Sequence, residues 1–88
     1  MTEQTSLIEY PCDFPIKIMG LSQQGFAQAV IEIVLRHDPN FDAASMEMRT
    51  SKTARYLGLT CTVRANSREQ LDALYQELCD HPMVAMVL

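Results

Sequence analysis

Cysteine and histidine side chains are the groups in this sequence that could bind a metal ion or act as nucleophiles. The 88 residues contain three cysteines and two histidines, at Cys12, Cys61, Cys79, His37 and His81. No two cysteines have the Cys-x-x-Cys spacing of common zinc sites, and an odd, scattered set of thiols is typical of a reducing compartment. We therefore interpret the thiols as buried or incidental. A zinc site that joins them to a histidine remains the alternative.

General acid–base chemistry would need a base held close to its nucleophile. His37 and Asp38 fall at the end of one predicted helix, and Asp80 and His81 fall at the end of the other, far away in the sequence. The helix dipole favours positive charge in a last turn, which explains His37 without a catalytic role. The sequence therefore predicts no catalytic residue, no metal site and no cofactor, and a protein that is not an enzyme.

Positive charge is concentrated in the second half of the chain. Five basic residues lie between Glu47 and Glu69, a stretch that contains no acidic residue. Two of them, Lys52 and Arg55, fall in a polar turn where they could contact an anion, and the alternative is that they only keep an exposed turn soluble. The formal net charge of -4 argues against a general nucleic-acid-binding protein.

The clearest structural pattern is the alternation of side chains over residues 56–65. The apolar positions are Leu57, Leu59, Cys61, Val63 and Ala65, and the positions between them are Tyr56, Gly58, Thr60, Thr62 and Arg64. A period of two predicts a β-strand with one face against a core and a threonine-rich face toward solvent. Gly58 leaves a gap in such a strand or marks the close approach of another group.

A shorter strand and an amphipathic helix precede this central strand. The strand is predicted over residues 14–19, with Gly20 at its end. Ser22 is a suitable helix N-cap, and apolar residues then recur with helical spacing until residues 38–40, where proline stops the helix.

The remaining elements follow the same logic. We predict a strand over residues 44–50 and a polar turn at residues 51–55 that leads into the central strand. Ser67 and Gln70 have the spacing of a capping box and begin a second amphipathic helix. An uncharged, wholly apolar strand then occupies residues 83–88.

This order of elements predicts a fold of the α+β class. Two right-handed strand–helix–strand units split by a hairpin form a ferredoxin-like sandwich, with one four-stranded antiparallel sheet in the order 4-1-3-2 and both helices on one face. Residues 11–88 would form this single domain after a flexible N-terminal segment at residues 1–10. The sequence shows no apolar run that could span a bilayer and no signal-peptide pattern, which predicts a cytoplasmic protein.

The last predicted strand lies at an edge of this sheet although it carries no charged side chain. Proteins normally cover or pair such an edge, and the open sheet face would add Met19, Ala85 and Val87 to the threonines. We therefore predict a homodimer that pairs edges or covers the open face, with Met83, Ala85 and Val87 in its interface. Coverage by residues 7–12 of the same chain is the alternative.

Several segments carry a resemblance to a known family. They are FPIKIMG at residues 14–20, the Ser-Lys…Tyr hairpin at 51–56, REQLDALY at 68–75 and MVAMVL at 83–88. Together they resemble the YbeD-like family of small bacterial proteins, from Leu7 over nearly the whole chain. The family commonly has a glycine after Ser-Lys, where Thr53 and Ala54 stand here, which weakens the case for an anion site in this turn.

The resemblance implies a fold similar to the ACT-type regulatory domains, which bind amino acids at dimer interfaces. Ligand sites in those domains lie between the first strand and the first helix, which implies ligand-binding residues at Gly20, Leu21, Ser22 and Gly25. The resemblance implies no catalytic residue. The genes of the family often lie near lipoate-attachment genes, which implies a contextual link to lipoate metabolism.

Taken together, these features favour a regulatory or interaction module that binds a small metabolite or a partner protein. The alternative is an RNA-binding module, because RNA-recognition domains share this topology and bind bases on the open sheet face.

Overall fold

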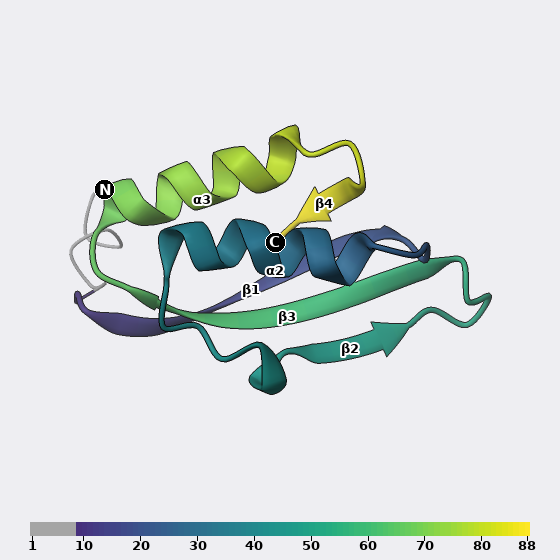
Figure 1. Cartoon of the computed structure of the whole chain (residues 1–88), viewed down its shortest axis with the longest axis horizontal. Helices are drawn as coiled ribbons and strands as arrows, with labels where there is room; N and C mark the ends of the chain where they lie inside the picture. The colour runs from purple at the N-terminus through teal and green to yellow at the C-terminus, as the bar shows by residue number, and fades with distance from the viewer. Residues whose placement is uncertain (1–8) are drawn as a thin grey trace, which may run out of the picture.

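The computed structural model describes residues 9–88 as two layers, a four-stranded antiparallel sheet and a pair of helices on one of its faces (Figure 1). In chain order the elements are β1 (Cys12–Leu21), α2 (Phe26–His37), a short 3-10 helix η1 (Ala43–Ser45), β2 (Glu47–Thr50), β3 (Tyr56–Ala65), α3 (Arg68–Asp80) and β4 (Val84–Val87). The sheet order is β2-β3-β1-β4. The predicted ferredoxin-like sandwich and its strand order are therefore confirmed.

The predicted flexible segment at residues 1–10 lies outside the described residues except for Glu9 and Tyr10. Tyr10 is half-buried and packs against the core. The division into a flexible segment and a domain from residue 11 stays a prediction.

The central pair of strands, β1 and β3, determines which side chains enter the core. The two strands pair from Cys12 opposite Ala65 to Leu21 opposite Tyr56. Residues that lie opposite each other share a sheet face, so the rows that contain Ile16 and Ile18 point toward the helices. The buried apolar residues are Ile16, Ile18, Phe26, Val30, Ile33, Val34, Phe41, Leu59, Cys61, Val63, Ala65, Leu71, Leu74 and Leu78.

The first strand is longer than its sequence pattern predicts, and Gly20 does not end it. Gly20 is buried inside β1. A Cβ atom there would clash with the Met83 carbonyl oxygen and would lie 2.7 Å from the Phe26 ring. The glycine is therefore explained by close packing inside the chain and not by the end of a strand.

The first helix begins later than predicted, because Gly25 and not Ser22 is its N-cap. Gly25 has a φ of 91°, a left-handed conformation that glycine adopts without steric cost. Ser22 instead donates its backbone N–H to the Arg55 carbonyl oxygen over 2.7 Å. This bond ties the β1–α2 connection to the β2–β3 hairpin.

The strand predicted over residues 44–50 is too long at its start. The Asp42 side chain accepts a hydrogen bond from the Ala44 N–H and begins the single 3-10 turn η1. Such local side-chain bonds compete with strand pairing. β2 consequently starts only at Glu47.

The second helix begins as predicted. Ser67 accepts a hydrogen bond from the Gln70 N–H, and the Gln70 side chain accepts one from the Asn66 N–H, one residue before the position expected for a capping box.

The last strand pairs in a different register from the one expected. Val87 lies opposite Ile18 on the helix side, and Met86 lies opposite Met19 on the open face. The pairing jumps from Met86 to Val84, which leaves Ala85 as a bulge residue and breaks the period of two. The placement of Val87 on the open face was therefore wrong.

Within residues 9–88, no helix is both long and apolar enough to cross a membrane.

Candidate functional site

The face of the sheet opposite the helices carries the site. In the described part of the chain both helices lie on the other face, as Figure 1 shows. On the open face, Thr60 lies between Lys17 and Glu47, and in the next row Gly58 lies between Met19 and Arg49. Side chains from three strands therefore surround two small residues of β3.

These residues line a hollow of about 810 Å³ that is open to solvent. β1 contributes Lys17 and Met19, β3 contributes Tyr56, Gly58 and Thr60, and β2 contributes its whole length; Leu88 also lines the hollow. This volume lies in the range of small-ligand pockets, and it would also admit a large side chain of a partner.

Gly58 forms the floor of the hollow because it has no side chain. The surrounding residues are not so crowded that only glycine would fit at this position. A Cβ atom on Gly58 would meet the Arg49 carbonyl oxygen at 3.6 Å and the Met19 Cγ at 4.0 Å, which are ordinary contacts. The predicted gap at Gly58 is thus present on the open face, where the described residues leave room for a Cβ atom.

The rim of the hollow is charged. Lys17 and Arg49 contribute two positive charges, and Glu47 contributes one negative charge. Among residues 9–88, the ion pairs involve neither Lys17 nor Arg49. By contrast, Arg64, on the same face, pairs with Asp13 over 3.1 Å.

The edge strand β4 extends this surface with apolar side chains. Met86 and Leu88 are 50% and 62% exposed, and Ala85 is also exposed. Met83 and Val87, which we predicted to lie in an interface, are half-buried and pack against the core of their own chain. Of the predicted interface residues, Ala85 is thus the one whose side chain the structure leaves exposed.

The predicted ligand-binding segment lies outside the hollow. Gly20 is buried, whereas Leu21, at the end of β1, and Ser22 and Gly25, in the connection to α2, are exposed. Leu21 lies opposite Tyr56 and so borders the open face. A ligand site in this segment stays a prediction.

The two predicted anion contacts, Lys52 and Arg55, are exposed in the turn that joins β2 and β3. They do not line the hollow, although the neighbouring Ser51 and Tyr56 do. Their contact with an anion stays a prediction.

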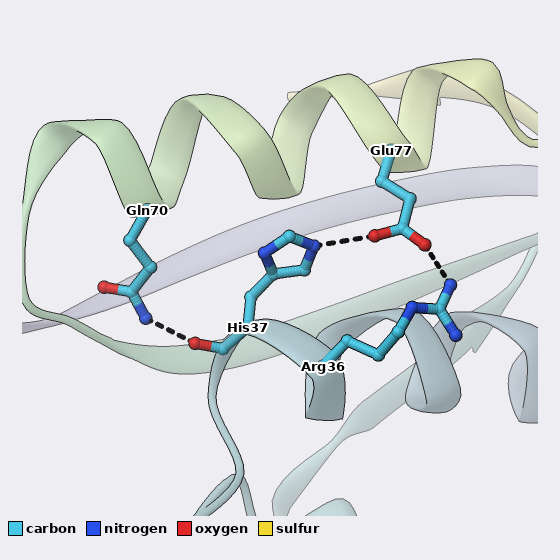
Figure 2. Close-up of polar contacts among 4 residues, drawn as sticks. All are labelled: Arg36, His37, Gln70 and Glu77. Atoms are coloured by element: carbon cyan, nitrogen blue, oxygen red, sulfur yellow. Dashed lines mark hydrogen bonds and ion pairs between the residues drawn. The ribbon is translucent and has the colours of Figure 1, made fainter.

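A polar cluster that the sequence did not reveal joins the two helices (Figure 2). Glu77 of α3 forms an ion pair with Arg36 and lies 2.7 Å, from Oε1 to Nε2, from His37, both on α2. The hydrogen bond to Arg36, followed by the one to His37, lowers the pKa of Glu77, and the same carboxylate raises the pKa of Arg36. Gln70 adds a hydrogen bond of 2.7 Å to the His37 carbonyl oxygen.

This cluster holds α2 and α3 together in the helix layer, across the sheet from the hollow. Its residues are about 40 positions apart in the sequence, so no local motif could have revealed it.

The thiols do not form a reactive site with it. Burial raises the pKa of the Cys61 thiol to about 11, which keeps it protonated and a poor nucleophile at neutral pH. Cys12 is half-buried and Cys79 is exposed on α3. No group of three or more His, Cys, Asp or Glu side chains in residues 9–88 could hold a metal ion together.

RNA binding on this face would need aromatic side chains on the central strands. On the open sheet face, the aromatic residue that the described strands provide is Tyr56, at one end of β3.

Comparison with known proteins places the chain in a sequence family. A family model described as "Protein of unknown function (DUF493)" matches residues 5–88. A UPF0250 protein of Nitrosomonas europaea is 64% identical over 88 residues, with both chains covered completely. A UPF0250 protein of Bordetella pertussis is 64% identical over 85 residues, which cover 97% of this chain and 93% of that protein.

Two solved structures share the fold at low sequence identity. Protein HP0495 from H. pylori aligns with a TM-score of 0.75 at 17% identity and covers 92% of this chain and 85% of its own. The ACT domain from GTP pyrophosphokinase of Chlorobium tepidum aligns with a TM-score of 0.59 at 18% identity and covers 88% of this chain and 97% of its own. The similarity to ACT domains expected from the sequence is confirmed at the level of the fold.

Proposed function

The chain belongs to the DUF493 family of proteins of unknown function, and we propose that it is a non-enzymatic regulatory or interaction module. It works as a homodimer through its β4 edge and binds a small metabolite or a partner protein on the open sheet face. A cytoplasmic location and a link to lipoate metabolism stay predictions.

The hollow beside an uncharged edge strand is the observation that carries this proposal. The hollow has a small floor, an apolar side and charged groups that are not ion-paired within residues 9–88. An edge strand without charge offers free backbone groups to another strand. In β4 the exposed Ala85 and Met86 would lie at such a seam.

The chemistry of the described side chains also supports a binding role. Cys61 is buried with a raised pKa, and the carboxylate nearest to a histidine, that of Glu77, is bound by Arg36 as well. The fold is also used as a domain of a larger protein, since the structural relative from Chlorobium tepidum is an ACT domain of GTP pyrophosphokinase.

Light scattering of the purified protein tests the homodimer. We expect a dimer for the wild type and a monomer for Met86→Lys, because the new charge would lie in the seam. Leu35→Lys on α2 is the matched control, since Leu35 is 38% exposed and lies in the helix layer; it should remain a dimer. A monomeric wild type would contradict the homodimer. Val87→Lys is unsuitable because Val87 packs against the core.

A further inference from the structure

The edge of the sheet that β2 forms is open. β2 pairs on one side with β3, and within residues 9–88 no strand lies on its other side (Figure 1). All four residues of β2 are exposed, and its apolar residue, Met48, is 61% exposed. An open edge of this kind is a surface on which a further strand can pair.

The register of the sheet shows which backbone groups of β2 are available to such a strand. On β3 the Tyr56 carbonyl oxygen faces the β2 side, where it accepts the Ser51 N–H over 2.9 Å. Because backbone groups alternate along an antiparallel strand, the even-numbered residues of β3 face β2. They lie opposite the odd-numbered residues of β2. The N–H and C=O groups of the even-numbered residues of β2, Met48 and Thr50, therefore point outward.

The side chains of β2 are complementary to those of a second copy of β2. Glu47 and Arg49 lie two residues apart on the open face of the sheet, with Met48 between them on the helix side. If two copies run antiparallel with Met48 opposite Met48, Glu47 of each copy lies opposite Arg49 of the other. Cross-strand pairs of opposite charge stabilise a sheet. Neither charge forms an ion pair with another of the described residues of its own chain.

Charge and backbone direction select the same register. With Met48 opposite Met48, the outward N–H and C=O groups of the two copies face each other, as a hydrogen-bonded pair requires. A shift by two residues keeps this backbone match but places Glu47 opposite Glu47 or Arg49 opposite Arg49. Like charges directly opposite each other destabilise a sheet, so those two registers are disfavoured.

We propose that two copies of the chain join their β2 strands antiparallel about Met48, so that their sheets continue into one another and Glu47 pairs with Arg49 on both sides of the axis. This β2 seam goes beyond the proposed function, which uses β4 at the opposite edge of the sheet. Exposed ion pairs and a few backbone hydrogen bonds each contribute little to association, so we expect the β2 seam to form at high protein concentration.

Sedimentation velocity of Met86→Lys from about 10 µM to about 1 mM tests the β2 seam, because this variant lacks the β4 pairing of the proposed function. We expect a monomer that becomes a dimer as the concentration rises. Adding Glu47→Arg or Arg49→Glu should weaken this self-association about tenfold or more. An equimolar mixture of those two variants should associate as strongly as Met86→Lys itself, because each strand again meets opposite charges.

Glu69→Arg and Arg68→Glu are the matched controls, since they make the same changes of charge at exposed positions of α3. Alone or mixed, they should leave the self-association of Met86→Lys unchanged. Circular dichroism verifies that all variants are folded.

Three outcomes would overturn the inference: no self-association up to about 1 mM, self-association that the β2 variants do not weaken, or a mixture of those variants that associates no better than either alone. The β4 dimer is tested separately, by the masses of the wild type and Met86→Lys in dilute solution. Either seam can therefore be contradicted while the other stands.

Discussion

At the scale of single residues, Ala54 holds a backbone conformation that its side chain disfavours. Its φ is 60°, in the left-handed region, and it is the one non-glycine residue with positive φ in the described chain. In that conformation a Cβ atom costs about 1–2 kcal/mol. Glycine at this position would avoid the cost, but part of the gain in stability would be lost because glycine has more conformational freedom in the unfolded chain. The position coincides with the turn where the YbeD-like resemblance leads us to expect a glycine.

We predict that Ala54→Gly raises the free energy of unfolding by about 0.5–1 kcal/mol, measured by urea denaturation. Thr53→Gly is the control in the same turn. It should lower stability, because Thr53 Oγ1 accepts a hydrogen bond from the Arg55 N–H. Equal or lower stability of Ala54→Gly would show that the turn relaxes without strain.

At the scale of the elements, Glu77 makes the contact between α2 and α3 depend on pH. Its pKa is lowered in the folded protein, chiefly by Arg36 and then by His37 (Figure 2). A carboxylate with a lowered pKa adds stability above its unfolded pKa of about 4.3, and this stability is lost as the pH falls through the folded pKa.

We therefore expect Glu77→Gln to destabilise the protein at pH 7 by at most about 1 kcal/mol, because the pair lies at the surface. The difference from the wild type should shrink as the pH falls below about 4.3 and should vanish at a pH below the lowered pKa of Glu77 in the folded protein. Urea unfolding at both pH values measures it. Glu69→Gln, at an exposed position of the same helix, is the control. If Glu77→Gln remained less stable than the wild type at low pH, the ion pairs of Glu77 could not be the cause of the lost stability.

The elements themselves could largely be predicted from the sequence, because a period of two or of 3.6 determines which side chains are buried. The failures lie where one residue changes the pattern. The bulge at Ala85 turns Val87 toward the core, and the Asp42 side chain shortens β2, and neither effect alters the spacing of apolar residues. The contact of His37 with Glu77 depends on how two helices pack, which local spacing does not contain.

At the scale of the whole molecule, the two faces of the sheet differ in what they tolerate. Gly20 faces the helix layer, where a Cβ atom would clash with the Met83 carbonyl oxygen, and Gly58 faces the open side, where a Cβ atom has ordinary contacts. We predict that Gly20→Ala lowers the free energy of unfolding by about 1–3 kcal/mol and that Gly58→Ala changes it by less than about 1 kcal/mol. Thermal or urea unfolding of both variants compares them directly, and similar losses would mean that the open face is filled.

The gap at Gly58 was predictable, because a glycine inside an alternating strand stands out. The hollow itself was not, because its rim comes from three strands whose register brings Lys17, Arg49 and Tyr56 together. The ligand-binding segment at residues 20–25 came from the resemblance to ACT domains, and the hollow lies beside that segment rather than in it.

The end of α2 has a further consequence for the sheet. β2 pairs with β3 only from Leu57 to Thr60, so the outer side of β3 beyond Thr60 has no strand partner in the described chain. The buried Asp38 carboxylate accepts the Arg64 N–H there, over 2.9 Å. A side chain thus occupies the backbone donor that a foreign strand would use to start a cross-β ladder. The residue that terminates a helix also protects the neighbouring sheet from templated aggregation.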